Sequence, residues 1–91
     1  MRYLRTFESW SVSNLGNQEC LVKNYDFSDI YKVISFIDKI NKTFNEFDHH
    51  PTKLIWQGTS VQIWLNTHTT KSISEKDIQL SNQLDNIYNN L

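Results

Sequence analysis

The segment from residue 30 to residue 44 constrains the fold of this chain more than any other feature. Its apolar residues recur at helical spacing and form one stripe: Ile30, Val33, Ile34, Ile37, Ile40 and Phe44. Ser28 is positioned to act as the N-cap of this helix, with Asp29 favourably placed at its positive end. Pro51, the only proline, biases its predecessor away from helical geometry. The helix is therefore expected to end before the two histidines that precede the proline.

Four other segments carry the pattern of β-strands. Residues 10–12 and 20–27 are predicted to form a hairpin, although Lys23 falls among the apolar positions of the second segment. Residues 53–57 and 60–66 are predicted as two further strands joined by a tight turn. The last strand alternates as a half-buried strand does, with Val61, Ile63 and Leu65 on one face against Gln62, Trp64 and Asn66 on the other.

A second helix is expected to begin at Ser74. This residue can serve as the N-cap with Asp77 as the acidic partner of a capping box, and its apolar stripe would be Leu80, Leu84, Ile87 and Leu91. The order strand, strand, helix, strand, strand, helix predicts an α+β fold. We expect a four-stranded antiparallel sheet with both helices packed on one face, which is a two-layer sandwich.

Chain length, net charge and cysteine content limit the class of protein to which this chain can belong. A chain of 91 residues favours a single domain over residues 1–91, and so small a core makes self-association reasonable. The net charge of -1 comes from scattered side chains, so no direct nucleic-acid partner is expected. Cys20 is the only cysteine, which indicates a reducing compartment. Residues 1–8 lead into no apolar run and no segment is apolar over a membrane-spanning length, so a cytoplasmic protein without membrane association is predicted.

The three histidines are the most informative candidates for chemistry. His49, His50 and His68 all fall in predicted loops or at the ends of predicted elements, where a rigid scaffold often displays working side chains. Histidine exchanges protons near neutral pH, so the group suits general acid–base chemistry. The alternative is that adjacent loop histidines are ordinary surface residues. Asp77 likewise has a purely structural interpretation as a helix cap, worth on the order of 1 kcal/mol.

A zinc site is the other chemical interpretation of the same side chains, because three imidazoles and a water can form a catalytic zinc site. Neighbours in an extended segment point in opposite directions, so His49 and His50 could not both bind one ion unless the loop were bent. Their adjacency also lacks the spacing that puts two ligands on one helix face. A zinc site is therefore the less favoured interpretation.

Several motifs agree in order and spacing with one known family. They are His49-His50-Pro51, the strand Val61 to Leu65 that leads into Thr67-His68, and Ser74 to Leu80 with Asp77 inside it. Trp10 and Tyr25-Asp26-Phe27 resemble the N-terminal strands of that family. In these motifs the chain resembles the pterin-4a-carbinolamine dehydratases from Trp10 to Leu84.

The resemblance implies a cofactor-free hydro-lyase that expels water from a 4a-hydroxytetrahydropterin to give the quinonoid dihydropterin. The implied catalytic side chains are His49, His50, His68 and Asp77. The first two hold the pterin and move protons, the third completes the site, and the carboxylate orients or polarises one imidazole. The implied substrate-binding set is His49, His50, Pro51, Thr67 and His68. Family members commonly form dimers or tetramers, so a homodimer or homotetramer is implied as well.

The chain departs from the family pattern near these residues. Asn45 stands four places before the first histidine, where the family often has an ionisable side chain. Thr52 replaces a common Glu, Thr69 replaces a common acidic residue, and residues 70–72 replace a Gly-Gly turn. The family's N-terminal helix is also largely missing. An amide cannot exchange a proton as a carboxylate does, so the alternative function is a catalytically weak pterin-binding or dimerisation module of the same fold.

Overall fold

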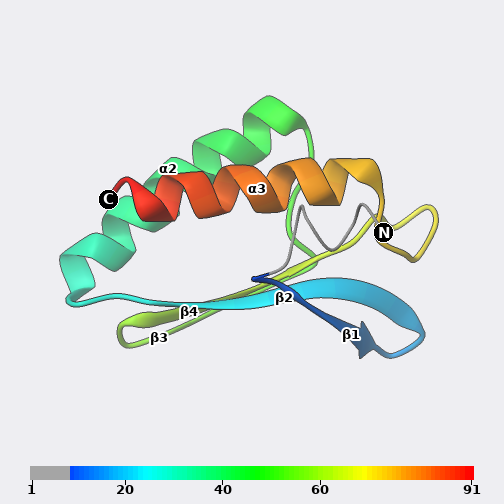
Figure 1. The fold of residues 1–91 in the computed structure, drawn as a ribbon, viewed down its shortest axis with the longest axis horizontal. Helices are drawn as coiled ribbons and strands as arrows, with labels where there is room; N and C mark the ends of the chain where they lie inside the picture. Colours follow the sequence, from blue (N-terminus) through cyan, green and yellow to red (C-terminus); the bar gives the residue numbers. More distant parts are fainter. Residues whose placement is uncertain (1–8) are drawn as a thin grey trace.

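The computed structural model of the chain describes residues 9–91, in which strands and helices follow one another in the predicted order (Figure 1). Their bounds are β1 Ser11–Leu15, β2 Gln18–Asp26, α2 Ile30–Phe47, β3 Lys53–Gln57, β4 Ser60–Leu65 and α3 Glu75–Asn89. The strands form one antiparallel sheet in the order β1-β2-β4-β3. Both helices lie on the same face of this sheet (Figure 1). The predicted α+β two-layer sandwich is confirmed.

The hydrophobic core lies between the sheet and the two helices. The central strands β2 and β4 pair so that Leu21 lies opposite Leu65 and Tyr25 lies opposite Val61, and all four side chains are buried. The buried apolar side chains of the helices are Val33, Phe36, Ile40 and Phe44 from α2 and Ile78, Leu80 and Leu84 from α3. The core therefore joins elements that are distant in the sequence.

Helix α2 has a different N-cap from the predicted one. The cap is Asp29 and not Ser28, since its Oδ1 accepts a hydrogen bond from the backbone N–H of Lys32 at 3.0 Å. A carboxylate in this place satisfies a free amide of the first turn and suits the positive end of the helix. At the other end the helix stops at Phe47, and Asp48 adopts a left-handed conformation with φ of 51°. The prediction that the helix ends before the histidines is confirmed.

The apolar stripe predicted for α2 is wrong at two positions. Ile30 and Ile34 are 39% and 51% exposed, whereas Phe36, which the stripe omitted, is fully buried. The buried apolar side chains of α2 follow steps of three and four residues: Val33, Phe36, Ile40 and Phe44. The inner face of the helix is therefore rotated away from Ile30 and Ile34. Together with the exposed Tyr31, these two side chains form an apolar surface at the start of α2.

Lys23 lies on the apolar face of β2 because a partner on α3 compensates its charge. Its Nζ atom lies 2.6 Å from Oδ1 of Asp85. The same carboxylate accepts hydrogen bonds from the Tyr25 hydroxyl at 2.6 Å and from the Trp10 indole N–H at 3.2 Å. A partly buried charge is tolerated when it is paired and hydrogen-bonded. This network explains why the alternation of β2 is imperfect.

Helix α3 begins after the predicted N-cap Ser74, and its predicted stripe is confirmed: Leu80 and Leu84 are buried, and Ile87 and Leu91 pack against the core. Neither α2 nor α3 combines the length and the apolarity that crossing a membrane requires. The expectations about residues 1–8, namely the lack of an apolar leader and of most of an N-terminal helix, lie outside the described residues.

Tyr25 predicts a loss of stability in alkaline solution. Burial, and then the hydrogen bond to Asp85, raise the pKa of Tyr25 well above its ordinary value. A group whose pKa is raised by folding contributes stability that is complete below its unfolded pKa, about 10 for tyrosine, and that is lost as the pH rises above it. Above about pH 10, unfolding is expected to become easier by up to about 1.4 kcal/mol per pH unit on account of this hydroxyl.

Urea unfolding at a series of alkaline pH values measures the effect. The free energy of unfolding should fall less steeply with pH in Tyr25→Phe than in the wild type. Tyr31→Phe, which removes the hydroxyl of an exposed ring, serves as the control and should keep the wild-type slope. Equal slopes for all three proteins would contradict the role given to Tyr25.

Candidate functional site

The first two histidines follow directly on the end of α2. After Asp48 has turned the chain, the backbone N–H of His49 donates to the carbonyl of Phe44 at 3.1 Å. The side chain of His49 is largely buried, and its Nε2 lies 2.6 Å from Oδ1 of Asp77. This contact joins the end of α2 to the first turn of α3.

Asp77 is the buried centre of the site. Its Oδ2 accepts hydrogen bonds from the Thr67 hydroxyl at 2.9 Å and from the backbone N–H of Ser74 at 2.9 Å. The second of these is the acidic half of the predicted capping box, which is present. A buried carboxylate is tolerated only with such partners. Asp77 therefore caps α3 and contacts the His49 imidazole at the same time.

All three histidines line one pocket of about 290 Å³. The connection between α2 and β3 supplies one wall and the connection between β4 and α3 supplies the other. The lining residues are Asp48, His49, His50, Pro51, Asn66, Thr67, His68 and Thr69. The fold thus brings together the predicted substrate-binding set, whereas Asp77 lies behind the wall and contacts His49 and Thr67.

The three imidazoles differ in how they are held. Asp77 binds the ring of His49, but within residues 9–91 no hydrogen bond holds the ring of His50 or of His68. Both of these residues are exposed, and the ring of His50 lies near that of Phe44, with 6.2 Å between the centroids. An imidazole with uncommitted nitrogens can bind a ligand and exchange a proton with it. The pocket therefore contains one imidazole that a hydrogen bond holds and two whose nitrogens have no hydrogen bond within residues 9–91.

The turn before α3, which lacks the two glycines of the family pattern, is closed by backbone hydrogen bonds. The backbone N–H of Thr67 donates to the carbonyl of Ser72 at 2.9 Å, and that of Lys71 donates to the carbonyl of Thr67 at 2.8 Å. Lys71 has a φ of 54°, in the left-handed region that glycine adopts at less cost. This turn places the Thr67 hydroxyl on Asp77 and leaves His68 exposed.

Asn66 is the pocket residue whose placement the sequence pattern missed. It was expected on the exposed face of the last strand, but it is 1% exposed, because β4 ends at Leu65 and the alternation stops there. Its amide accepts from the Thr52 hydroxyl at 2.5 Å and donates to Oε1 of Gln18 at 2.7 Å. A buried polar side chain usually has such internal partners. Because these partners lie on other segments, the local sequence pattern gives no signal for the burial of Asn66.

The part of the chain that the structure describes contains no cluster of side chains that would bind zinc. Among residues 9–91 no group of three or more His, Cys, Asp or Glu side chains is arranged to hold a metal ion. The three imidazoles share one pocket.

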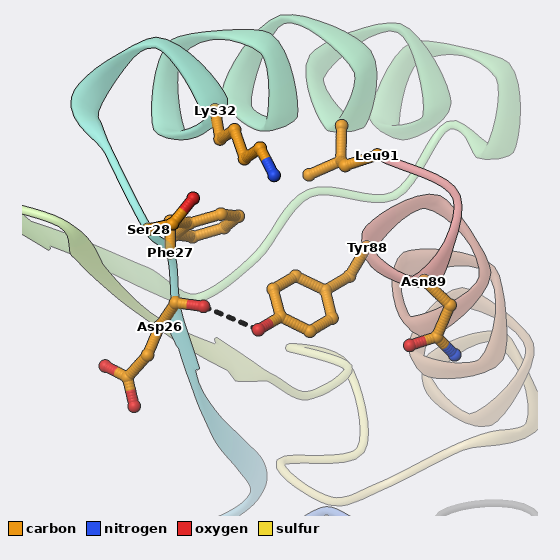
Figure 2. Close-up of a pocket in the computed structure, with 7 residues that line it drawn as sticks. All are labelled: Asp26, Phe27, Ser28, Lys32, Tyr88, Asn89 and Leu91. Carbon is orange, nitrogen blue, oxygen red and sulfur yellow. Dashed lines mark hydrogen bonds between the residues drawn. The ribbon is translucent and has the colours of Figure 1, made fainter.

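A second cavity, of about 370 Å³, lies at the opposite end of α2 (Figure 2). Its lining residues are Asp26, Phe27, Ser28, Lys32, Tyr88, Asn89 and Leu91. The Tyr88 hydroxyl donates to the backbone carbonyl of Asp26 at 2.5 Å, as Figure 2 shows. An 18-residue helix is about 27 Å long, so the two cavities are well separated. This cavity contains no histidine and provides a place for control substitutions.

Sequence comparisons connect the chain with one family. The family model described as pterin 4 alpha carbinolamine dehydratase matches residues 1–87. A protein of Sulfolobus acidocaldarius is 31% identical over 86 residues, which cover 94% of this chain and 89% of the relative. A protein of Paracidovorax citrulli is 32% identical over 82 residues, which cover 90% and 70%. Both relatives carry the name pterin-4-alpha-carbinolamine dehydratase as a provisional assignment.

Two solved structures share the fold at 22% sequence identity. One, from Brucella melitensis, is described as a transcriptional coactivator/pterin dehydratase, with a TM-score of 0.83 over 96% of this chain and 89% of its own. The other is a pterin dehydratase-like protein identified as a RuBisCO assembly factor in the alpha-carboxysome, with a TM-score of 0.77 over 91% and 93%. At this identity the likeness concerns the fold.

Asp77 is expected to contribute to the stability of the fold, whether or not the chain is an active enzyme. Asp77→Asn replaces an acceptor by a donor in a buried site that presents donors from Ser74, Thr67 and His49. The free energy of unfolding in urea should fall by about 1–3 kcal/mol. Asp38→Asn, which removes an exposed carboxylate 3.6 Å from Lys42, is the matched control and should change stability by less than about 0.5 kcal/mol. If both variants were as stable as the wild type, the hydrogen bonds assigned to Asp77 would be wrong.

Proposed function

This chain belongs to the pterin 4 alpha carbinolamine dehydratase family, and from that premise we propose that it is a hydro-lyase of tetrahydropterin recycling. It removes water from a 4a-hydroxytetrahydropterin and releases the quinonoid dihydropterin. The observation that carries the proposal is the single pocket lined by His49, His50 and His68. Its volume of about 290 Å³ is near the lower end for small-molecule sites, which suits one flat bicyclic ring.

The proposed reaction divides the work among the three imidazoles. Dehydration requires that one proton leave a ring nitrogen and that another reach the departing hydroxyl. We assign these transfers chiefly to His50 and His68, whose ring nitrogens carry no hydrogen bond within residues 9–91. His49 binds the pterin and takes part in proton movement in an orientation that Asp77 sets. These steps call on side chains alone, with no metal or other cofactor.

Two further residues complete the proposed binding surface. Pro51 offers an apolar contact beside His50, and it stiffens the backbone there. Thr67 shapes the opposite wall, since its hydroxyl is already bonded to Asp77. Recognition of the pterin through this wall therefore depends on the shape of the backbone as well as on side-chain donors.

We also propose that residues 1–91 form one domain that works as a homodimer or homotetramer in the cytoplasm. The apolar surface of Ile30, Tyr31 and Ile34 supports association, because contiguous exposed apolar side chains commonly mark a protein interface. The unpaired, buried Cys20 agrees with a reducing compartment. We propose no direct nucleic-acid partner and no association with a membrane.

The second candidate is a pterin-binding or dimerisation module of the same fold with little turnover. The observation that favours it is Asn45, an exposed amide where the family often has an ionisable side chain. The assembly factor with the same fold is an example of a protein of this shape whose described role is assembly. Under this alternative a pterin would protect the chain against heat without being converted.

The dehydratase proposal predicts which substitutions stop turnover. The purified chain is mixed with freshly generated 4a-hydroxytetrahydropterin, and the loss of that species is followed. His50→Ala and His68→Ala should each lower the rate by about 10²-fold or more, because each removes a proton-transfer group. Asn89→Ala, which alters the second cavity, is the control and should keep the wild-type rate.

A wild-type rate equal to that in buffer would contradict the proposed reaction. A rise in melting temperature with pterin under the same conditions would then favour the binding module. If Asn89→Ala lowered the rate as much as the histidine variants did, the site would have been placed in the wrong cavity.

A further inference from the structure

We propose that Thr52 and Asn66 act as a pair of positioning residues that fix the backbone of the His50-Pro51 segment. Only the kinetic part of this inference rests on the proposed dehydratase function. Neither residue is assigned a role by the family pattern, and Thr52 departs from it. The argument starts from the way the segment is attached at its two ends.

The first attachment lies on the N-terminal side of His50. His49 is bound through its backbone N–H to Phe44 at 3.1 Å and through its Nε2 to Asp77 at 2.6 Å. Both partners belong to helices that pack in the core. His49 therefore gives the segment a rigid starting point.

The second attachment is Thr52. Its backbone N–H donates to the carbonyl of Trp64 at 2.8 Å, and its hydroxyl donates to Oδ1 of Asn66 at 2.5 Å. Asn66 is itself fixed, because it is buried and donates to Oε1 of Gln18 on β2 at 2.7 Å. The hydroxyl of Thr52 is thus connected to the first residue of the central strand β2 through one buried amide.

Only two residues, His50 and Pro51, lie between these attachments. The pyrrolidine ring fixes φ of Pro51, and it also restricts the backbone of the preceding residue. No hydrogen bond within residues 9–91 holds the His50 ring, which lies beside the Phe44 ring with 6.2 Å between the centroids. The position of the His50 backbone is therefore set chiefly by the attachments on either side of it.

The pair works through His50 and not on the substrate. Asn66 lines the pocket, and its oxygen and one N–H of its amide are engaged by protein groups. The Thr52 hydroxyl donates its only hydrogen bond to Oδ1 of Asn66. The hydroxyl of Thr52 donates and Oδ1 of Asn66 accepts, so the two side chains match each other in hydrogen-bonding character.

The test compares Thr52→Val, which keeps the shape and removes the hydroxyl, with Thr52→Ser, which keeps the hydroxyl. The first readout is the NMR signal of each imidazole Cε1–H in the protein without ligand, with the His50 signal identified through His50→Gln. In Thr52→Val the His50 signal should shift or split while the His68 signal stays unchanged. The second readout is turnover, for which kcat should fall about 10-fold with little change in KM, since small displacements of a reacting group slow a reaction steeply.

Thr52→Ser should restore the His50 signal and kcat to the wild-type values. If Thr52→Val lowered only the melting temperature, with the His50 signal and kcat unchanged, the pair would be merely structural and the inference would be overturned. Thr52→Ala carries the same comparison if the valine variant does not fold. If the wild type shows no dehydration, the NMR comparison still decides the positioning role, and only the proposed function fails.

Discussion

The contact between the buried carboxylate of Asp77 and the His49 imidazole is the interaction on which the site depends. A carboxylate without exposure is unfavourable unless donors surround it, and here Thr67, Ser74 and His49 all supply contacts. These donors come from the loop after α2, from the turn after β4 and from the start of α3. Satisfying one buried carboxylate therefore brings together two connections that are distant in the sequence, the one after α2 and the one between β4 and α3. The pocket exists because these segments meet at this carboxylate.

Under the proposed function, the arrangement separates the residues that support the site from those that transfer protons. One imidazole is bound by a buried acid, while His50 and His68 are exposed on the two walls of the same pocket. Such a division is useful for acid–base work, because a proton-transfer group must be placed accurately without having its nitrogens occupied. In this chain the support comes from indirect bonds, through the hydrogen bond between Thr52 and Asn66 for one wall and through the turn that contains Lys71 for the other. The departures from the family pattern therefore fall among supporting residues as well as at Asn45.

Much of the fold could be predicted from the sequence, because periodicity and Pro51 act locally. Helical spacing located α2, alternation located β4, and Ser74 with Asp77 marked the start of α3. The errors arose where tertiary contacts decide. Exposure of Ile30 and Ile34 depends on which side of the helix meets the sheet, and the charge of Lys23 is compensated by Asp85, 62 residues away. The burial of Asn66 depends on partners on two other segments, so no short pattern contains it.

The central claim is that the three-histidine pocket is the place where a flat bicyclic heterocycle binds. The most direct test is to titrate the isotope-labelled chain with a stable pterin analogue and to follow every backbone amide by NMR. The account predicts that the largest shifts occur at residues 48–52 and 66–69, with little change at residues 26–28 and 88–91. Shifts confined to the second cavity, or none at saturating analogue, would contradict it.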